Sequence, residues 1–503
     1  NIIINNPNFI DAHTNLASII NKKLEYSEAS KLYKKLLKKH PNNIDLLSNY
    51  CHKLISSSKF KESTKLLNKL NKLNAENAKI FLSLGINFLK MQQIDQSLTC
   101  FKKVIAINPN LSSPYTNLGL IYTDYLKKYH EAISYLNKAI EIDSSNSTAF
   151  YNLGCAYNQL GNKEKGISYF KKAIKINPDH HKAIYNLSLY HLATDDYKNG
   201  WSEYESRKKT LEINEKILNI PKTKIWDGDK FNSTLVVHAE QGVGDEILIS
   251  SLYNELLNRQ NNLSVSCDKR LIKIFKRSFP GIKFLDRKSS FTVSNESKHI
   301  FSFSLGQYLR MNIKSFKNNS KKWLCSDFKR DKEIQSLILQ SNKVKIGISW
   351  KSPWAKQNNK NISLLQITSI MPESFFELIN LQYGDIKKDT EEVWKKDKRQ
   401  LILFKNIDYK NDFDSLISLI MNCDAVVTSS NVTAHFSGAL GKKTFLLVPI
   451  NALWYWQERK NKSIWYPNVH IYRQNEFNNW DYPINKLKSD LVDLFKKEVK
   501  KLV

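Results

Sequence analysis

Two polar loops in the second half of the sequence carry residue types suited to group transfer. The first, residues 238–247, reads HAEQGVGDEI and follows a short β-rich run. Gly242 and Gly244 let the backbone turn tightly, which places Asp245 near the start of the next apolar helix. A carboxylate at that point can face a ligand cleft, or it can cap the helix and stabilise it by about 1 kcal/mol.

The second loop, residues 429–435, reads SSNVTAH and lies between an expected strand and an expected helix. Its backbone N–H groups, the hydroxyls of Ser430 and Thr433 and the positive end of the helix dipole suit a diphosphate. His435 falls in the first helical turn. It either takes part in this anion site or is a partly buried side chain bonded to a neighbouring carbonyl, and the sequence leaves both interpretations open.

A third candidate segment, residues 350–360, is basic and follows another expected strand. Lys351 and Lys360 have the charge to contact phosphate oxygens. Lysine is abundant throughout the chain, however, so a solvated surface position is the more common role for each of them.

Composition narrows the ligand classes. The chain has 503 residues and a formal net charge of +29, which would suit nucleic acid or phosphorylated ligands. The basic residues are spread along the chain rather than clustered, so a general preference for lysine throughout the sequence explains the charge. Nucleic-acid binding is therefore not expected.

The six cysteines lie far apart, with no CxxC pair and no histidine at ligand spacing. They predict free thiols in a reducing compartment.

No apolar run approaches the ~20 residues of a membrane span, so we expect a cytoplasmic protein. The sequence opens on NIIINNP, without Met, a basic leader or a cleavage pattern. This opening is typical of the end of a helix followed by a turn, and we expect the sequence to begin inside a longer chain.

A long helical array precedes the candidate loops. The turn Pro41-Asn42 recurs as Pro109-Asn110, an interval of twice 34 residues, and apolar residues fall at helical spacing between the turns. A period of 34 resembles the tetratricopeptide repeat, over about residues 11–214, with five clear helix pairs and a looser sixth. Because one pair cannot bury its apolar face alone, such pairs stack into a superhelix with a concave groove.

One position in the first helix of each pair is Asn in five of the six units. The tetratricopeptide resemblance implies that this position faces the groove, where an amide can donate and accept bonds with the backbone of an extended peptide. Protein O-GlcNAc transferases use such an Asn ladder. The alternative is a local role between helices. The asparagines of this predicted peptide groove are Asn15, Asn49, Asn117, Asn152 and Asn186, with Ser83 in the third unit.

After residue 216 the helical pattern gives way to short β-rich runs separated by helices. This order predicts an α/β region of two Rossmann-like halves in a GT-B arrangement, with ligand between the carboxyl ends of two parallel sheets. We expect strands at 234–239, 263–267, 282–285, 299–303, 344–350, 376–381, 401–404, 425–428 and 444–448, helices at 331–340 and 413–421, and a C-terminal helix over 482–500.

The expected domains follow from these patterns. A tetratricopeptide superhelix occupies residues 1–215, and a linker occupies 216–230. The N-terminal Rossmann-like half spans 231–335, and the C-terminal half, which ends in the C-terminal helix, spans 336–503.

The stretch from residue 200 to residue 480 resembles bacterial tetratricopeptide proteins with a heptosyltransferase-like domain, which are relatives of glycosyltransferase family 9. Order and spacing agree along this whole stretch. The matching pieces are Gly200-Trp201, Glu203–Glu205, Trp226–Gly228, Glu240–Asp245, Leu381-Gln382, His435–Gly441, Trp465–Pro467, Tyr472-Arg473 and Trp480.

The resemblance implies an inverting glycosyltransferase that uses a nucleotide sugar as substrate and needs no metal or other cofactor. Asp245 matches the general base, which takes the proton of the acceptor hydroxyl attacking the anomeric carbon. The loop from Ser430 to His435 matches the diphosphate site, where preorganised N–H groups and a Lys stabilise the leaving charge. The implied nucleotide-sugar site comprises Gly242, Gly244, Lys351, Lys360, Gln382, Ser430, Asn431, Thr433, Ala434 and His435.

Ser430 departs from the family, which usually has Asp just before the Asn or Thr of this loop. A missing carboxylate there would alter nucleotide or sugar binding, or mark a weakened enzyme. Two functions stay open: a glycosyltransferase whose repeats recruit a protein acceptor, and a non-catalytic tetratricopeptide scaffold with a degenerate transferase domain. Asp245 and His435 favour the first and Ser430 favours the second. A glycan acceptor, with the repeats serving assembly, is also open.

Overall fold

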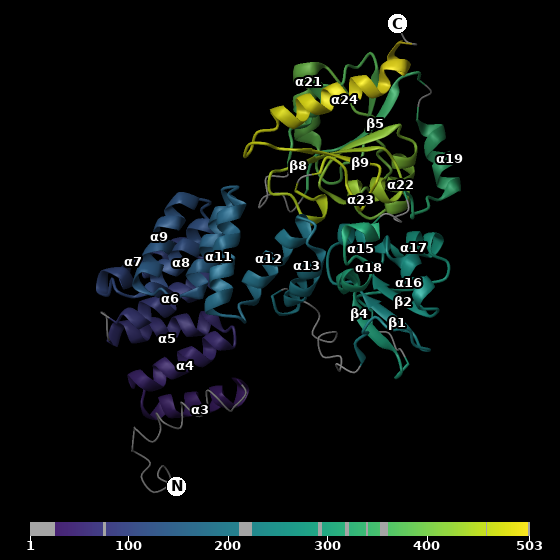
Figure 1. Cartoon of the computed structure of the whole chain (residues 1–503). Coiled ribbons are helices and arrows are strands. Elements are labelled where there is room, and N and C mark those ends of the chain that lie inside the picture. Colours follow the sequence, from purple (N-terminus) through teal and green to yellow (C-terminus); the bar gives the residue numbers. More distant parts are fainter. Residues whose placement is uncertain are drawn as a thin grey trace. The chain divides into compact units, whose positions relative to one another are not determined.

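The computed structural model describes residues 26–73, 77–210, 224–289, 294–316, 321–338, 341–352, 361–458 and 460–500, with side chains through 495. The chain divides into two compact units, Asn1–Ala183 and Ile184–Val503. Where the structure describes it, the first unit contains helices only, and the second contains helices and two sheets (Figure 1).

The first unit is a series of helix pairs. Each helix buries one stripe of residues three or four positions apart, as α4 does with Leu47, Cys51 and Leu54, because the opposite stripe faces water. The helices are α3 (Tyr26–Lys39), α4 (Ile44–Ser56), α5 (Phe60–Leu73), α6 (Ala78–Lys90), α7 (Ile94–Ile107), α8 (Ser112–Asp124), α9 (Tyr129–Ile142), α10 (Ser147–Gln159), α11 (Lys163–Ile176) and the start of α12 (His181–Ala193).

Small residues let the two helices of a pair approach closely. A Cβ at Gly119 would stand 2.4 Å from Leu136 Cγ, and a Cβ at Gly154 would stand 2.5 Å from the Phe170 ring. Each glycine of the first helix therefore receives a large side chain of the second, and a larger residue would push the pair apart. This is the packing that the repeat pattern predicts.

The turn inside each pair has the same backbone conformation. A residue with positive φ follows the first helix at intervals of 34, 35, 34 and 34 residues: Ser58, Gln92, Lys127, Gly161 and Asp195. The left-handed residue ends the first helix and reverses the chain. The predicted repeat is thereby confirmed through α13 (Tyr197–Tyr204), although its sixth pair lies largely in the second unit.

The second unit begins with the rest of α12, then α13 and a short helix, η1 (Glu205–Lys209), before two parallel sheets. The first sheet has the order β3-β2-β1-β4, with Val237 of β1 paired to Val265 and Ile300. Its elements are β1 (Leu235–His238), α15 (Val243–Ser250), α16 (Tyr253–Arg259), β2 (Leu263–Cys267), α17 (Ile272–Ser278), β3 (Lys283–Asp286), β4 (Lys298–Phe301), η3 (Ser302–Leu305), α18 (Gly306–Leu309), η4 (Ile313–Phe316) and α19 (Phe328–Leu337).

The second sheet is parallel with the order β6-β5-β7-β8-β9. All residues of β7 and β8 are buried, as expected for parallel strands covered on both faces. The elements are β5 (Val344–Ser349), α20 (Leu364–Ser369), β6 (Phe376–Asn380), α21 (Lys387–Asp397), α22 (Phe413–Met421), β7 (Ala425–Ser429), α23 (Val432–Ala439), β8 (Thr444–Val448), η6 (Trp454–Trp456), β9 (Val469–Arg473) and α24 (Asp481–Lys500). The predicted parallel α/β region is thereby confirmed.

Two strand predictions need correction. Residues 401–404 do not form a strand, because only Ile402 pairs with Ile379 of β6 and Leu403 is 46% exposed. The strand β9 was not predicted. It completes the sheet beside β8, and α24 packs against it.

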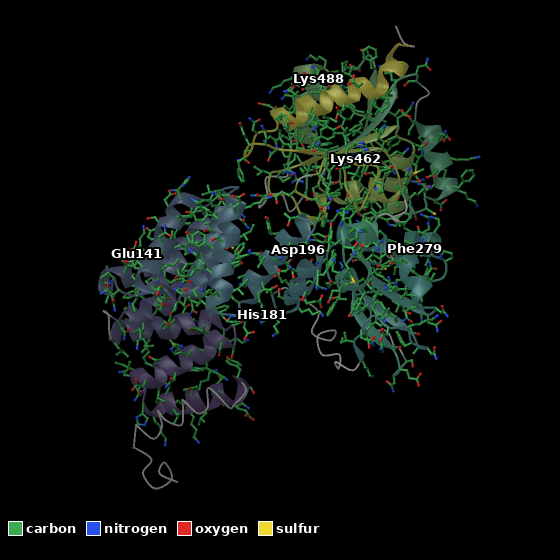
Figure 2. All side chains as sticks on the ribbon, viewed as in Figure 1. Glu141, His181, Asp196, Phe279, Lys462 and Lys488 are labelled. Atoms are coloured by element: carbon green, nitrogen blue, oxygen red, sulfur yellow. The ribbon has the colours of Figure 1, made fainter. Side chains whose placement is uncertain are left out.

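Helix α13 shares one apolar core with both sheets of the second unit. Trp201 and Tyr204 of α13 belong to the same buried cluster as Val237 of β1 and Trp454 and Trp456 after β8. Asp196, labelled in Figure 2, caps α13 by accepting from the Asn199 N–H at 3.3 Å. The last helix pair is therefore an integral part of the α/β unit. None of the described helices combines the length and the apolarity that spanning a membrane requires.

Candidate functional site

The loop after β1 turns directly into α15. Gly242 precedes the helix, and its N–H donates to Asp245 Oδ2 at 3.1 Å, so the half-buried carboxylate caps the helix. Burial raises the pKa of Tyr455 and of Tyr466, and the negative charge of Asp245 raises both further. The predicted base therefore lies close to aromatic side chains of the half that carries the second sheet, in addition to serving as a cap.

The first turns of α15 and α23 meet. A Cβ at Gly244 would stand 2.7 Å from Cδ2 of His435, so the close approach of the two helices requires glycine there. This contact brings the two predicted loops, one from each half, into direct proximity. Gly242 is exposed, and the contact of either glycine with a nucleotide stays a prediction.

Asn431 organises the loop between β7 and α23. Its Oδ1 accepts from the Thr433 N–H at 2.9 Å and caps the helix. Its Nδ2 donates to Ser349 Oγ at 2.7 Å and to the Lys351 carbonyl at 3.2 Å. The side chain thus joins the carboxyl ends of the neighbouring strands β5 and β7.

His435 is 3% exposed and enclosed by aromatic rings. Its Nδ1 lies 2.7 Å from the Tyr466 hydroxyl, and its ring centroid lies 5.3 Å from that of Trp456. The same indole donates from Nε1 to Ser430 Oγ at 2.8 Å. His435 is therefore buried, and its Nδ1 lies at hydrogen-bond distance from a tyrosine hydroxyl, a contact that the sequence did not suggest.

Thr433 and Ala434 are fully buried in the first turn of α23. Within the described ranges of the chain, Thr433 Oγ1 has no hydrogen-bond partner. A buried hydroxyl without a partner costs free energy. A ligand group that accepts a hydrogen bond from the Thr433 hydroxyl would remove this cost and would therefore bind more tightly.

Gln382 and Lys351 are placed by other side chains. The Gln382 side-chain oxygen accepts from Ser349 Oγ and from the backbone N–H groups of Trp350 and Lys351, all between 2.8 and 3.0 Å. Lys351 forms an ion pair with Asp389. Gln382 therefore fixes the backbone of the loop after β5, and the amine of Lys351 is already paired with a carboxylate. Lys360 lies outside the described residues.

The predicted peptide groove is described from Asn49 onward, since Asn15 lies outside the described residues. Asn49, Asn117 and Asn186 are half-buried, whereas Asn152 is 4% exposed. Asn117 Nδ2 donates to the Ser113 carbonyl one turn earlier at 2.9 Å, which leaves its oxygen for another partner.

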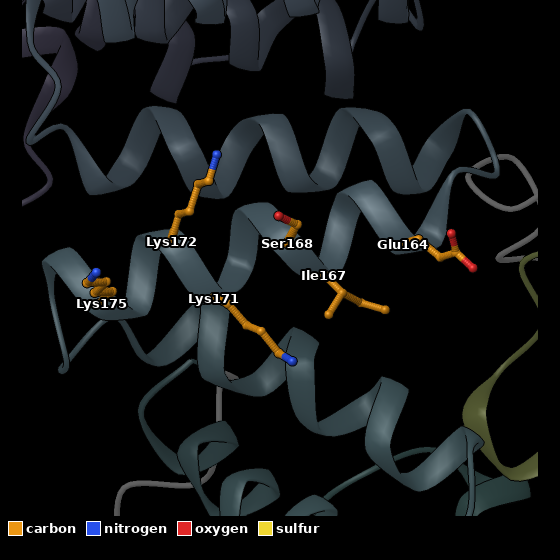
Figure 3. A pocket seen from close by; sticks show the side chains of 6 residues that line it. All are labelled: Glu164, Ile167, Ser168, Lys171, Lys172 and Lys175. Atoms are coloured by element: carbon orange, nitrogen blue, oxygen red, sulfur yellow. The ribbon is translucent and has the colours of Figure 1, made fainter.

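A hollow of about 470 Å³ lies along one face of α11 (Figure 3). Three of its side chains are lysines, and the others are acidic, apolar and hydroxyl groups. They are Glu164, Ile167, Ser168, Lys171, Lys172 and Lys175. None of them was predicted as a site residue, and a single helix supplies all of them.

A buried ionic group at the carboxyl edge of the first sheet was not predicted. Glu246 is 2% exposed. Its oxygens accept from Arg287 Nη1 at 2.7 Å and from the Asp268 N–H at 2.8 Å. Burial raises the pKa of Glu246 to about 8, against the opposing effect of the Arg287 guanidinium. The sequence offered no reason to select Glu246, because the motif of residues 238–247 was interpreted through the adjacent Asp245 alone.

The raised pKa predicts how stability depends on pH. The folded carboxyl ionises near 8 and the unfolded one near 4.5, so the unfolded state loses its proton first. Stability of the second unit should fall as pH rises from about 4.5 to 8, by on the order of 2–4 kcal/mol. Glu246→Gln should abolish this fall, which denaturant unfolding at a series of pH values measures.

A histidine pair provides an internal control. His238 Nε2 lies 2.9 Å from His299 Nδ1, and burial, followed by the charge of His299, lowers the pKa of His238 to about 4. This group makes stability rise with pH between about 4 and 6.5, the opposite sign. Glu246→Gln should keep that rise, and a decline between pH 6.5 and 8 that persists in the variant would contradict the assignment to Glu246.

A second buried ion pair joins η1 to the loop after β1. The side chains of Arg207 and Glu240 are both fully buried, and Arg207 Nη2 donates to Glu240 Oε1 at 2.9 Å. Glu240 also accepts from the N–H and the hydroxyl of Ser302, the first residue of η3. Among the described residues, no three His, Cys, Asp or Glu side chains come together in a way that would hold a metal ion.

Comparison with protein families identifies the repeats. A model described as "Tetratricopeptide repeat" matches residues 147–180, and one described as "TPR repeat" matches residues 125–161. Together with the periodic turns and the helix packing, these matches show that the helical array is built of tetratricopeptide repeats, a framework suited to protein interaction.

Similarity to individual proteins is low. Protein FlbA of Caulobacter vibrioides is 24% identical over 335 residues, which cover 60% of this chain and 53% of FlbA. The chain thus spans about half the length of this curated relative. Among solved structures, YrrB, titled "a TPR protein with an unusual peptide-binding site", is 24% identical with a TM-score of 0.30, covering 37% of this chain and 94% of its own. MamA is 24% identical with a TM-score of 0.30, covering 34% of this chain and 93% of its own.

Proposed function

We propose that the second unit is an inverting glycosyltransferase of GT-B type that uses a nucleotide sugar, and that the repeats recruit a protein acceptor. The contact between α15 and α23 supports this proposal, because it brings Asp245 and the β7–α23 loop together from the two halves. The resemblance to heptosyltransferase-like proteins supports it independently. The observation that carries it furthest is the buried hydroxyl of Thr433 in the first turn of α23, for which the described part of the chain supplies no hydrogen-bond partner.

In the proposed reaction, Asp245 takes the proton from an acceptor hydroxyl. The acceptor oxygen forms a bond to the anomeric carbon, and the bond from that carbon to the phosphate oxygen breaks with inversion. The nucleoside diphosphate leaves with the electron pair. The Thr433 hydroxyl donates to the phosphate oxygens, and the positive end of the α23 dipole stabilises the charge that they gain in the transition state.

The acceptor is proposed to bind in the repeat groove. Asn49, Asn117 and Asn186 present half-buried amides at the same position of their helices. Such amides can bond to the backbone of an extended segment whatever its side chains. The acceptor would thus be selected by an accessible extended segment rather than by one sequence.

Thr433→Val tests the donor site, because valine keeps the shape and removes only the hydroxyl. Without ligand the variant should be more stable by about 1 kcal/mol, since an unsatisfied buried hydroxyl is lost. Its affinity for the correct nucleoside diphosphate should fall roughly 10- to 100-fold, as expected for a hydrogen bond to a charged group. Calorimetric titration with UDP, ADP and GDP, and thermal unfolding, measure the two effects.

Ser437→Ala is a matched control, because Ser437 is also fully buried in α23 but its Oγ donates to the Ala434 carbonyl at 3.2 Å. It should leave nucleotide affinity unchanged. Equal affinity of wild type and Thr433→Val for a bound nucleotide would remove the proposed role of the α23 N-terminus.

A second candidate function is a scaffold with an inactive α/β part. The observation that favours it is that aromatic side chains already cover the β7–α23 loop. Ser430 accepts from Trp456, and the rings of Tyr455, Trp456 and Tyr466 surround His435. Failure of every tested nucleotide to bind would favour this candidate.

A further inference from the structure

The segment after β8, residues 454–457, covers the β7–α23 loop and is itself held by the last helix pair. On its inner side, Trp456 bonds to Ser430 and stacks at an angle on His435. On its outer side, the Trp454 ring packs edge-on against Trp201 of α13, with centroids 5.4 Å apart. The segment therefore lies between the repeats' final pair and the proposed diphosphate site.

Asp195 anchors this segment through polar contacts. Its Oδ1 accepts from Gln457 Nε2 at 2.8 Å, and its Oδ2 accepts from Lys460 Nζ at 2.7 Å. The Tyr197 hydroxyl bonds to both Asp195 and Gln457, at 3.0 Å in each case. Gln457 and Tyr197 are only 2% and 1% exposed, so the contact between them is shielded from water and strengthened by its surroundings. The Lys460–Asp195 pair is more open, with side chains 33% and 36% exposed.

The backbone conformation on both sides of the contact is unusual. Asp195 has φ +68°, and Gln457 has φ +43°. For a glutamine this conformation is costly, of order 1 kcal/mol or more in general, and it persists only where the surroundings hold it. Asp195 and Arg473, whose guanidinium donates to the Trp456 and Gln457 carbonyls, supply that hold.

Helix α13 also contacts the loop of the other half. The Tyr204 hydroxyl accepts from Gln241 Nε2 at 2.7 Å, three residues before Gly244. One end of the repeat array thus bonds to the loop that carries Asp245 and to the segment that covers the β7–α23 loop.

We propose that Asp195 is a positioning residue that, through Gln457 and Trp456, fixes the conformation of the β7–α23 loop, so that the last helix pair regulates the nucleotide site. This inference rests on the proposed function for its consequence, but the coupling itself is a property of the fold. A movement of α13 on acceptor binding would be transmitted to Ser430 and His435 through the same contacts.

Hydrogen exchange of the full chain tests the coupling without assuming any activity. Asp195→Ala removes both anchoring contacts and should raise amide exchange in residues 429–437 by at least about tenfold. Asp195→Asn keeps an acceptor for Gln457 and tolerates positive φ, so it should restore most of the protection. Gln92→Ala, at the equivalent turn of another repeat with φ +61°, likewise places an alanine in the left-handed conformation and should leave residues 429–437 unchanged.

Two further measurements are needed. Exchange in β2 distinguishes a local effect from a general loss of stability, and nucleotide-dependent protection tests the proposed function separately. Exchange in β2, residues 263–267, should stay at the wild-type level in Asp195→Ala. Unchanged exchange at 429–437 in Asp195→Ala, or an equal rise in β2, would overturn the coupling. Adding UDP, ADP or GDP to the wild type tests the nucleotide site instead: absence of protection at 429–437 would count against the transferase and leave the coupling result standing.

Discussion

Arg207→Met is expected to destabilise the second unit by about 3–5 kcal/mol. The guanidinium is fully buried and donates to Glu240, to Glu205 and to Ser304. Its loss leaves the carboxylate of Glu240 charged and buried without its cationic partner. All ten tryptophans of the chain lie beyond residue 200, so denaturant unfolding followed by tryptophan fluorescence reports this unit alone.

The matched control is the double variant Arg207→Met with Glu240→Gln. Removing both charges takes away the uncompensated carboxylate, so the double variant should recover much of the lost stability. Lys396→Met, which breaks an exposed pair with Glu392 in the same unit, should change stability by less than about 0.5 kcal/mol. A loss at Arg207 as small as that at Lys396 would contradict the structural role assigned to the buried pair.

Asp245→Asn is expected to lower kcat roughly 10²- to 10⁴-fold, the usual contribution of a general base. The asparagine oxygen can still accept from the Gly242 N–H, so the helix cap should survive and stability should change little. Donor affinity should stay within about twofold, because the proposed diphosphate contacts come from α23. Steady-state kinetics with donor binding measured separately provide the comparison.

Glu246→Gln is the neighbouring control for this experiment. It replaces a carboxyl group in the same helix turn, but at a buried position bonded to Arg287, so it should leave kcat at the wild-type level below pH 7. Equal losses in both variants would indicate disturbance of α15 rather than removal of a base.

The repeat array was predictable from the sequence because its signals are local and repeated. Gly119, Gly154 and the turn residues recur at nearly constant intervals, and each recurrence supports the others. The parallel strands were predictable where apolar runs were bounded by turns. Residues 401–404 were an exception. They lie beside the free edge of β6, but only Ile402 pairs with it, and a short apolar run does not encode how far such pairing extends.

Local patterns predicted the candidate site only as two loops, and the expected GT-B arrangement added that ligand lies between the two halves. Their meeting at Gly244 and His435 depends on how the halves pack, which no local pattern encodes. The aromatic cover from Tyr455 and Trp456, the anchor at Asp195 and the Arg207–Glu240 pair join residues tens to hundreds of positions apart. These contacts had no sequence signal beyond the presence of the residue types, so the boundary between repeats and α/β part could not be drawn from periodicity.

Release of nucleoside diphosphate from a panel of nucleotide sugars, measured for the wild type and Asp245→Asn, tests the central claim most directly. The account predicts that at least one donor releases its nucleotide in the presence of a chelator, that release accelerates with a protein acceptor, and that the variant is slower by at least a hundredfold. No release from any donor, or equal release by the variant, would contradict it.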